Sequence, residues 1–142
     1  MEPRINMIMV SARDIGALQA FYEGGLGWQP WMPASAGSVA YKVGTAVLIF
    51  VNADYLAKES GIPAATTPKS HMALFVSSKE EVDAAMALAV KAGARITSAV
   101  RNRDQGLYSG YFVDPEENCW ELVWSPHMPL AADGSLTLPG AS

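Results

Sequence analysis

The chain has 142 residues, of which half are apolar and 17% are charged, a composition typical of a folded globular protein. Its formal net charge is −4 and its 10 lysines and arginines form no run, which argues against nucleic acid or an anionic membrane as a partner. No stretch approaches the roughly 18 apolar residues of a membrane-spanning helix, the N-terminus lacks an apolar signal region, and the single cysteine excludes an intrachain disulfide, so a cytoplasmic protein is expected.

The first half of the chain is predicted to form a strand, a helix and a hairpin. The stretch "INMIMVSA" is a strand candidate, and Asp14 is placed to cap a helix that Gly24 and Gly25 would end. The two prolines of "WQPWMPASAG" indicate an irregular edge or loop, after which "SVAYKV" and "AVLIFV" form a hairpin around a Gly-Thr turn. Residues 52–70 combine a helical turn with a connection rich in Pro and Thr, and they are the best candidate for an internal boundary.

The second half starts the same pattern again. The stretch "HMALFVSS" is a strand candidate, and a helix follows in which Ser78 and Glu81 have the spacing of a capping box, with Gly93 placed to end it. The stretch "ARITSAV" is a strand, "RNRDQGL" is a polar loop, and "YSGYFV" with "CWELVW" forms a second hairpin.

The two halves are related by a constant offset. Met7 and His71 are 64 residues apart (71 − 7), and the same offset carries the helix cap Asp14 onto the helix cap Ser78. Each half then consists of a strand, a helix and about three strands. A repeat of this length indicates a duplicated module rather than a solenoid.

Three stretches of the sequence resemble the vicinal oxygen chelate superfamily, which includes glyoxalase I, fosfomycin-resistance enzymes, extradiol dioxygenases and bleomycin-resistance proteins. They are "ARDIGALQAFYEGGLGW", "HMALFVSSKEEVDAAMALAVKAGA" and "GYFVDPEENCWEL". The third departs from the family pattern at Glu117, where the family usually has a turn glycine. Asn118 beside it can adopt the left-handed conformation that such a turn needs.

The resemblance implies an α+β fold of two tandem βαβββ modules, at about residues 4–62 and 69–124. Their curled mixed sheets would surround a cup, with the helices outside. A tail at 125–142 would complete a single glyoxalase/bleomycin-resistance-like domain spanning 1–142.

The resemblance also implies metal ligands at four equivalent positions, in the first and last strands of each module. His71 and Glu121 occupy two of these positions, whereas Met7 and Ile49 occupy the other two and offer no donor suited to a hard or borderline cation. No metal and no other cofactor is therefore expected. The alternative is a divalent Zn, Ni, Fe or Mn ion held by His71 and Glu121, with water, substrate or a partner chain completing its coordination.

Glu121 and His71 are also the best candidates for catalytic residues, although the sequence identifies no catalytic set. Strand alternation places Glu121 on the face opposite Trp120 and Leu122, and therefore toward the cup. There it could contact a ligand, act as a general base assisted by His71, or form a structural ion pair with His71.

Four further residues are candidates for ligand binding. Ser109 and Tyr111 share one face of their strand, and Trp31 could form a wall for a flat apolar molecule. Arg101 or Arg103 could meet an anionic ligand, although a solvated face is the favoured interpretation of both, and Arg101 is the one kept as a candidate.

The first functional hypothesis is a protein that binds a small apolar or aromatic molecule in the cup, with a degenerate metal site. The alternative is a metal-dependent lyase or dioxygenase acting on a substrate with vicinal oxygens. The sequence leaves open whether the protein is an enzyme. A homodimer is expected, because two chains together can close the cup and bury exposed strand edges, and the modules could pair within one chain or between chains.

Overall fold

The computed structural model describes residues 1, 3, 5–64 and 71–137. The first module contains β1 (Met7–Ala12), α1 (Ile15–Gln19) continuing as a π-helical turn (Ala20–Gly25), β2 (Ser38–Val43), β3 (Ala46–Asn52) and α2 (Ala53–Ser60). The second contains β4 (His71–Phe75), α3 (Lys79–Ala92), β5 (Arg95–Asn102), a short 3-10 turn (Asp104–Gly106), β6 (Tyr108–Val113) and β7 (Cys119–Trp124). Part of the predicted internal boundary, at 65–70, and the end of the tail, from 138, lie outside the described residues.

The helix ends follow the capping signals of the sequence. The Asp14 side chain caps α1 by accepting a hydrogen bond from a backbone amide three residues later. Ser78 accepts from the Glu81 amide at 3.1 Å at the start of α3. Gly93 ends α3 with a φ of 109°, a conformation that a residue with a side chain rarely adopts. These predicted boundaries are confirmed.

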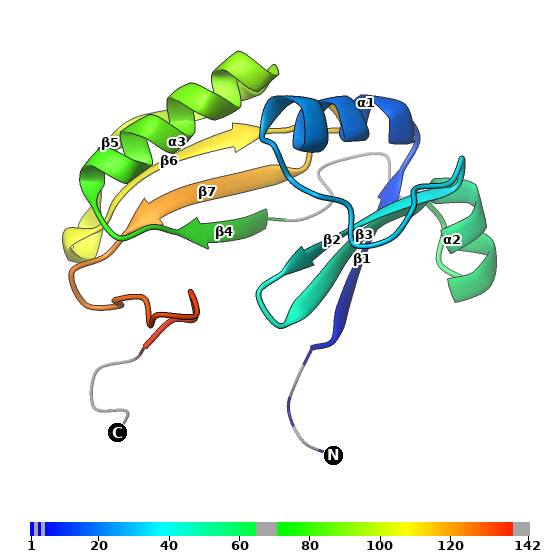
Figure 1. The fold of residues 1–142 in the computed structure, drawn as a ribbon, viewed down its shortest axis with the longest axis horizontal. Coiled ribbons are helices and arrows are strands. Elements are labelled where there is room, and N and C mark those ends of the chain that lie inside the picture. Colours follow the sequence, from blue (N-terminus) through cyan, green and yellow to red (C-terminus); the bar gives the residue numbers. More distant parts are fainter. Residues whose placement is uncertain (2, 4, 65–70, 138–142) are drawn as a thin grey trace.

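The strands form two sheets, with the orders β1-β3-β2 and β4-β7-β6-β5, which confirms the α+β fold. The segment predicted to be irregular makes only isolated bridges, at Pro30 and Ser35, so the first sheet has one strand fewer than the second. Figure 1 shows α1 and α3 on the same side of the two sheets, while α2 lies at the far end of the first module. In the described part of the chain, no helix is both long enough and apolar enough to cross a membrane.

One apolar core joins the two modules. Tyr22, at its centre, is fully buried, and its ring lies 5.2 Å from the Phe50 ring of the first sheet and 6.4 Å from the Trp120 ring of the second, measured between centroids. Burying an aromatic side chain of this size contributes roughly 1.5–3 kcal/mol. The packing of helix against sheet therefore also fixes the second sheet relative to the first.

Candidate functional site

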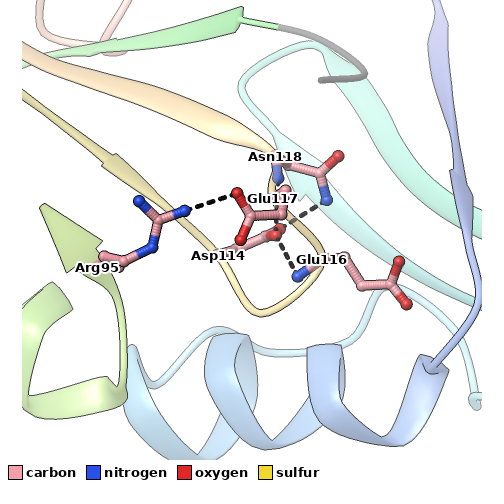
Figure 2. A network of polar contacts seen from close by, with 5 residues as sticks. All are labelled: Arg95, Asp114, Glu116, Glu117 and Asn118. Carbon is pink, nitrogen blue, oxygen red and sulfur yellow. Dashed lines mark hydrogen bonds and ion pairs between the residues drawn. The ribbon is translucent and has the colours of Figure 1, made fainter. Parts of the chain in front are cut away.

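The turn between β6 and β7 anchors the second module to the first, and Figure 2 shows the contacts that Asp114 makes within this turn. Asp114 accepts hydrogen bonds from the backbone amides of Glu116, at 2.8 Å, and Asn118, at 3.0 Å. Its other oxygen accepts from the Asn118 side chain at 2.8 Å and from the Tyr22 hydroxyl of the first module at 2.7 Å. Glu116 accepts from the backbone amide of Arg13, just before α1, at 2.8 Å. These bonds set the position from which β7 starts, and so the position of Glu121.

The left-handed residue of this turn is Glu117, with a φ of 65°, so the expectation that Asn118 would take that conformation is wrong. Asn118 is instead fully buried and uses its amide groups to bind Asp114. Glu117 forms an ion pair with Arg95 at 2.7 Å (Figure 2). Both side chains are largely exposed, so this pair contributes at most about 1 kcal/mol.

The strand register reproduces the sequence repeat at the four positions that the resemblance implies for metal ligands. In the first sheet, parallel β1 and β3 place Met7 opposite the residue two before Ile49. In the second sheet, parallel β4 and β7 place His71 opposite the residue two before Glu121. Met7 is therefore equivalent to His71, and Ile49 is equivalent to Glu121.

Glu121 lies on the face of the second sheet opposite α3, which we term the helix-free face. It is half-buried, and one of its oxygens accepts a hydrogen bond from the Ser109 hydroxyl at 2.8 Å. Tyr111 is paired with Glu121 across β6 and β7. The pKa of the Tyr111 phenol is raised, first by burial and then by the neighbouring Glu121 carboxylate. The structure thus brings together three of the predicted ligand-binding residues.

The other three predicted residues do not join this cluster. His71 is exposed at the start of β4, and among the described residues no ion pair links it to Glu121, so the structural ion pair considered from the sequence is absent there. Trp31 belongs to the first module and is 51% exposed. Arg101 is exposed on β5 opposite Ser109.

Arg103, which the sequence analysis named beside Arg101 but did not keep as a candidate, belongs to this cluster. It is half-buried, and its guanidinium carbon lies 5.0 Å from the centre of the Tyr111 ring. Arg101 and Arg103 are two residues apart in a stretch predicted to be a polar loop, and strand alternation places residues at this spacing on the same face, so it could not decide between them. The only available signal was that both arginines lie close to the predicted strand.

The donor set does not fit a divalent metal. In the part of the chain that the structure describes, no group of three or more His, Cys, Asp or Glu side chains could hold an ion. Met7 and Ile49, at the equivalent positions of the first sheet, supply only a thioether and a hydrocarbon, which are poor ligands for these cations. A metal at His71 and Glu121 would need its remaining ligands from outside the described residues.

A cleft of about 710 Å³ lies between the two modules, and Ala73 and Phe75 of β4 form part of its wall. The rings of Trp28, Tyr41 and Trp120 line it, and Leu136 of the tail contributes to its wall. Tyr41 donates its hydroxyl to a carboxylate at 3.1 Å, and Trp120 donates its indole N–H to Tyr22 at 2.8 Å. Because these polar atoms are already paired within the protein, the cleft is mainly apolar, and none of the six predicted residues lines it.

Comparison with known families decides the classification of this fold. The family model of the glyoxalase-like domain matches residues 7–123, which is most of the chain. The chain belongs to the glyoxalase-like family. This confirms the resemblance to the vicinal oxygen chelate superfamily.

Solved structures resemble this glyoxalase-like protein over most of its length. A glyoxalase-related enzyme from Fulvimarina pelagi is 28% identical, with a TM-score of 0.88 over 95% of this chain and 97% of that one. A glyoxalase/bleomycin resistance protein/dioxygenase family enzyme from Burkholderia phytofirmans PsJN is 23% identical, with a TM-score of 0.74 over 84% and 96%. A lactoylglutathione lyase from Agrobacterium tumefaciens is 22% identical, with a TM-score of 0.70 over 87% and 94%. The last two likenesses concern the fold alone. No curated protein matches the sequence significantly.

Proposed function

We propose that this glyoxalase-like protein binds a small, mainly apolar or aromatic molecule on the helix-free face of its second sheet, without a metal ion. The observation that carries the proposal is the setting of Glu121, which is held by Ser109 and lies beside Tyr111, while its equivalent in the first sheet is an isoleucine. A carboxylate fixed in this way can anchor a hydrogen-bond donor of a ligand. It is not part of a complete set of metal ligands among the described residues.

Apolar residues lie on the same face of the sheet as this polar anchor. Ala73 and Phe75 of β4 share the face of Glu121, as does Val123 of β7. Small-molecule sites usually combine a mainly apolar lining with a few polar groups that orient the ligand. The helix-free face has this composition, which supports binding ahead of metal-dependent lyase or dioxygenase chemistry.

Binding of 2-naphthamide, a neutral bicyclic probe, tests this proposal. We expect the probe to shift the backbone amide resonances of Ser109, Tyr111 and Glu121 in a 15N-labelled sample treated with chelator. Adding zinc, nickel, iron(II) or manganese should leave the affinity unchanged. The Glu121→Gln change should weaken binding about tenfold, because a charged hydrogen-bond acceptor is replaced by a neutral one.

Glu59→Gln is the matched control, because Glu59 is an exposed carboxylate on α2, outside the second sheet. Its affinity for the probe should equal that of the unmodified protein. Shifts confined to Trp28, Tyr41 and Trp120 would place the ligand in the cleft between the modules instead. Binding that appears only after metal is added, and is lost in Glu121→Gln, would favour the metal-dependent alternative.

We further propose that two copies of the chain form a homodimer. β1 and β4 are both edge strands, and among the residues that the structure describes no strand pairs with their outer sides. Met7 and Met9 on β1 are 42% and 59% exposed. An apolar strand edge left open to solvent is a site for association, and a second copy would cover it.

Light scattering after size exclusion tests the dimer. The expected mass is twice the 15.1 kDa of one chain. Met9→Lys should shift the protein to the monomer with little loss of stability, because a lysine is tolerated on an exposed edge but opposes its burial. Leu88→Lys, at a position 45% exposed on α3, is the matched control and should remain dimeric. A monomer of the unmodified protein at all concentrations would contradict the proposal.

A further inference from the structure

Arg103 carries a positive charge on the helix-free face that no carboxylate of the described residues neutralises. Its Nε donates to the Ser109 carbonyl at 3.2 Å, and its Nη2 donates to the Ser98 hydroxyl at 2.9 Å and to the Ala99 carbonyl at 3.2 Å. All three acceptors are neutral. In the described part of the chain, no carboxylate oxygen lies within ion-pair distance of this guanidinium. A half-buried arginine usually has such a partner, because leaving the charge unpaired is costly.

The guanidinium of Arg103 is held in one orientation. Its three hydrogen bonds fix it to β5 and β6, and the Tyr111 ring lies against it, with 5.0 Å from the guanidinium carbon to the ring centre. These bonds use Nε and Nη2, so Nη1 is left as a donor among the described residues. A donor that is already ordered loses little entropy when it binds a ligand.

The opposite charge lies across Tyr111 on the same sheet. Tyr111 is paired with Ser98 on β5 and with Glu121 on β7, so the three side chains form one row. Arg103 binds at the Ser98 end of this row, and Glu121 forms its other end. Both charges act on the Tyr111 phenol, whose pKa is raised by burial and by Glu121 while the Arg103 charge opposes that shift.

This row defines the chemistry of a matching ligand. A carboxylate can accept hydrogen bonds from Arg103, and the repulsion of Glu121 directs it to the arginine end of the row. A neutral or donor group of the same ligand then faces Glu121. A dianionic phosphate would meet a larger repulsion from Glu121, so a monoanionic carboxylate is the better match.

We propose that Arg103 binds the carboxylate of an aromatic or apolar acid, and that it makes the helix-free face select acids over neutral molecules of the same shape. This inference rests on the function proposed above and adds the chemical class of its ligand. It assigns the role to Arg103 rather than to Arg101, whose side chain is exposed and makes no hydrogen bond among the described residues.

A matched pair of probes tests the inference. 6-Hydroxy-2-naphthoate and 6-hydroxy-2-naphthamide have the same ring system and the same hydroxyl, which can donate to Glu121, and they differ in the charge of the group that faces Arg103. We expect the unmodified protein to bind the naphthoate about tenfold more tightly than the naphthamide, because one charge-assisted hydrogen bond increases affinity by about that factor. Arg103→Met should abolish this preference, so that the two probes bind with equal affinity, whereas Arg101→Met should preserve both the preference and the two affinities. Arg103→Lys keeps the charge without the fixed fork and should retain part of the preference.

The outcomes separate the two proposals. If both probes bind the helix-free face equally, the inference about Arg103 is wrong and the proposed function stands. If neither probe binds there, the proposed function itself fails. A preference that survives in Arg103→Met, or inorganic phosphate competing as strongly as naphthoate, would also overturn the inference. If Arg103→Met does not fold, Arg103→Lys provides the test. A preference for the naphthoate that is unchanged in Arg103→Lys and does not weaken as salt is added would show that no charge contact is involved, and would overturn the inference.

Discussion

Replacing Asp114 by alanine is expected to lower the free energy of unfolding by about 3 to 5 kcal/mol. Asp114 is 3% exposed, and its oxygens accept from the Tyr22 hydroxyl, the Asn118 side chain and the backbone amides of Glu116 and Asn118. Alanine accepts none of these bonds, and each buried donor left unpaired costs about 1 to 3 kcal/mol. Urea denaturation followed by circular dichroism measures the loss.

Two further variants separate the parts of this effect. Tyr22→Phe removes the hydroxyl that joins the modules and should cost about 1 to 3 kcal/mol, since it also leaves the Trp120 indole N–H without its acceptor. Asp104→Ala, at an exposed position in the polar loop, should stay within about 0.5 kcal/mol of the unmodified protein. A loss below about 1 kcal/mol in Asp114→Ala would show that the turn re-forms without its central carboxylate.

A side chain at Gly25 is expected to disrupt the contact between the helices of the two modules. A Cβ placed there would lie 2.4 Å from the Ala92 Cβ and 3.0 Å from the Ala92 Cα of α3. Real Cβ atoms essentially never approach so closely, and the Ala92 Cα belongs to the backbone, so a helix must move. Overpacking of this kind should make Gly25→Ala about 2 to 3 kcal/mol less stable, as measured by urea denaturation.

The neighbouring glycine offers the matched control. A Cβ at Gly24 would meet no atom within 4 Å, and its φ is not left-handed, so Gly24→Ala should be neutral or up to about 1 kcal/mol stabilising. Adding Ala92→Gly to Gly25→Ala should recover part of the lost stability, and this positive coupling identifies the pair as the point of contact. Purely additive losses in the double variant would mean that the helices adjust elsewhere.

Much of the local structure of this protein is determined by residues close together in the sequence. Asp14 and Ser78 cap their helices by accepting from amides three residues later, and Gly93 ends α3 with its own backbone conformation. Interactions over such short spacings can be recognised in a sequence. The repeat of 64 residues (71 − 7) likewise predicted that Met7 and His71 would occupy equivalent positions. The strand registers of the two sheets confirm this equivalence.

Only part of the candidate site could be predicted from the sequence. Strand alternation placed Ser109 and Tyr111 on one face of their strand and Glu121 toward the cup, because alternate residues of a regular strand point the same way. The pairing of β6 with β7 then showed that the three residues share one face of the sheet. The choice between Arg101 and Arg103 could not be made in this way. The two arginines are two residues apart, a spacing that alternation places on one face, and Arg103 lies beyond the end of β5 and folds back onto carbonyl groups that no spacing rule identifies.

Tertiary structure alone decided how the two modules are joined. The Tyr22 hydroxyl binds Asp114 across 92 positions of the chain, and Gly25 is pressed against Ala92 of the other module. Glu117 adopts the positive φ that the sequence analysis assigned to Asn118, in a turn held by hydrogen bonds to the buried Asp114 side chain. Each of these features depends on a contact between groups that are far apart in the sequence. Such contacts stabilise the protein only after folding has brought the groups together. By itself the sequence determined the elements, their ends and the faces of the regular strands, whereas the contacts between distant elements came from packing.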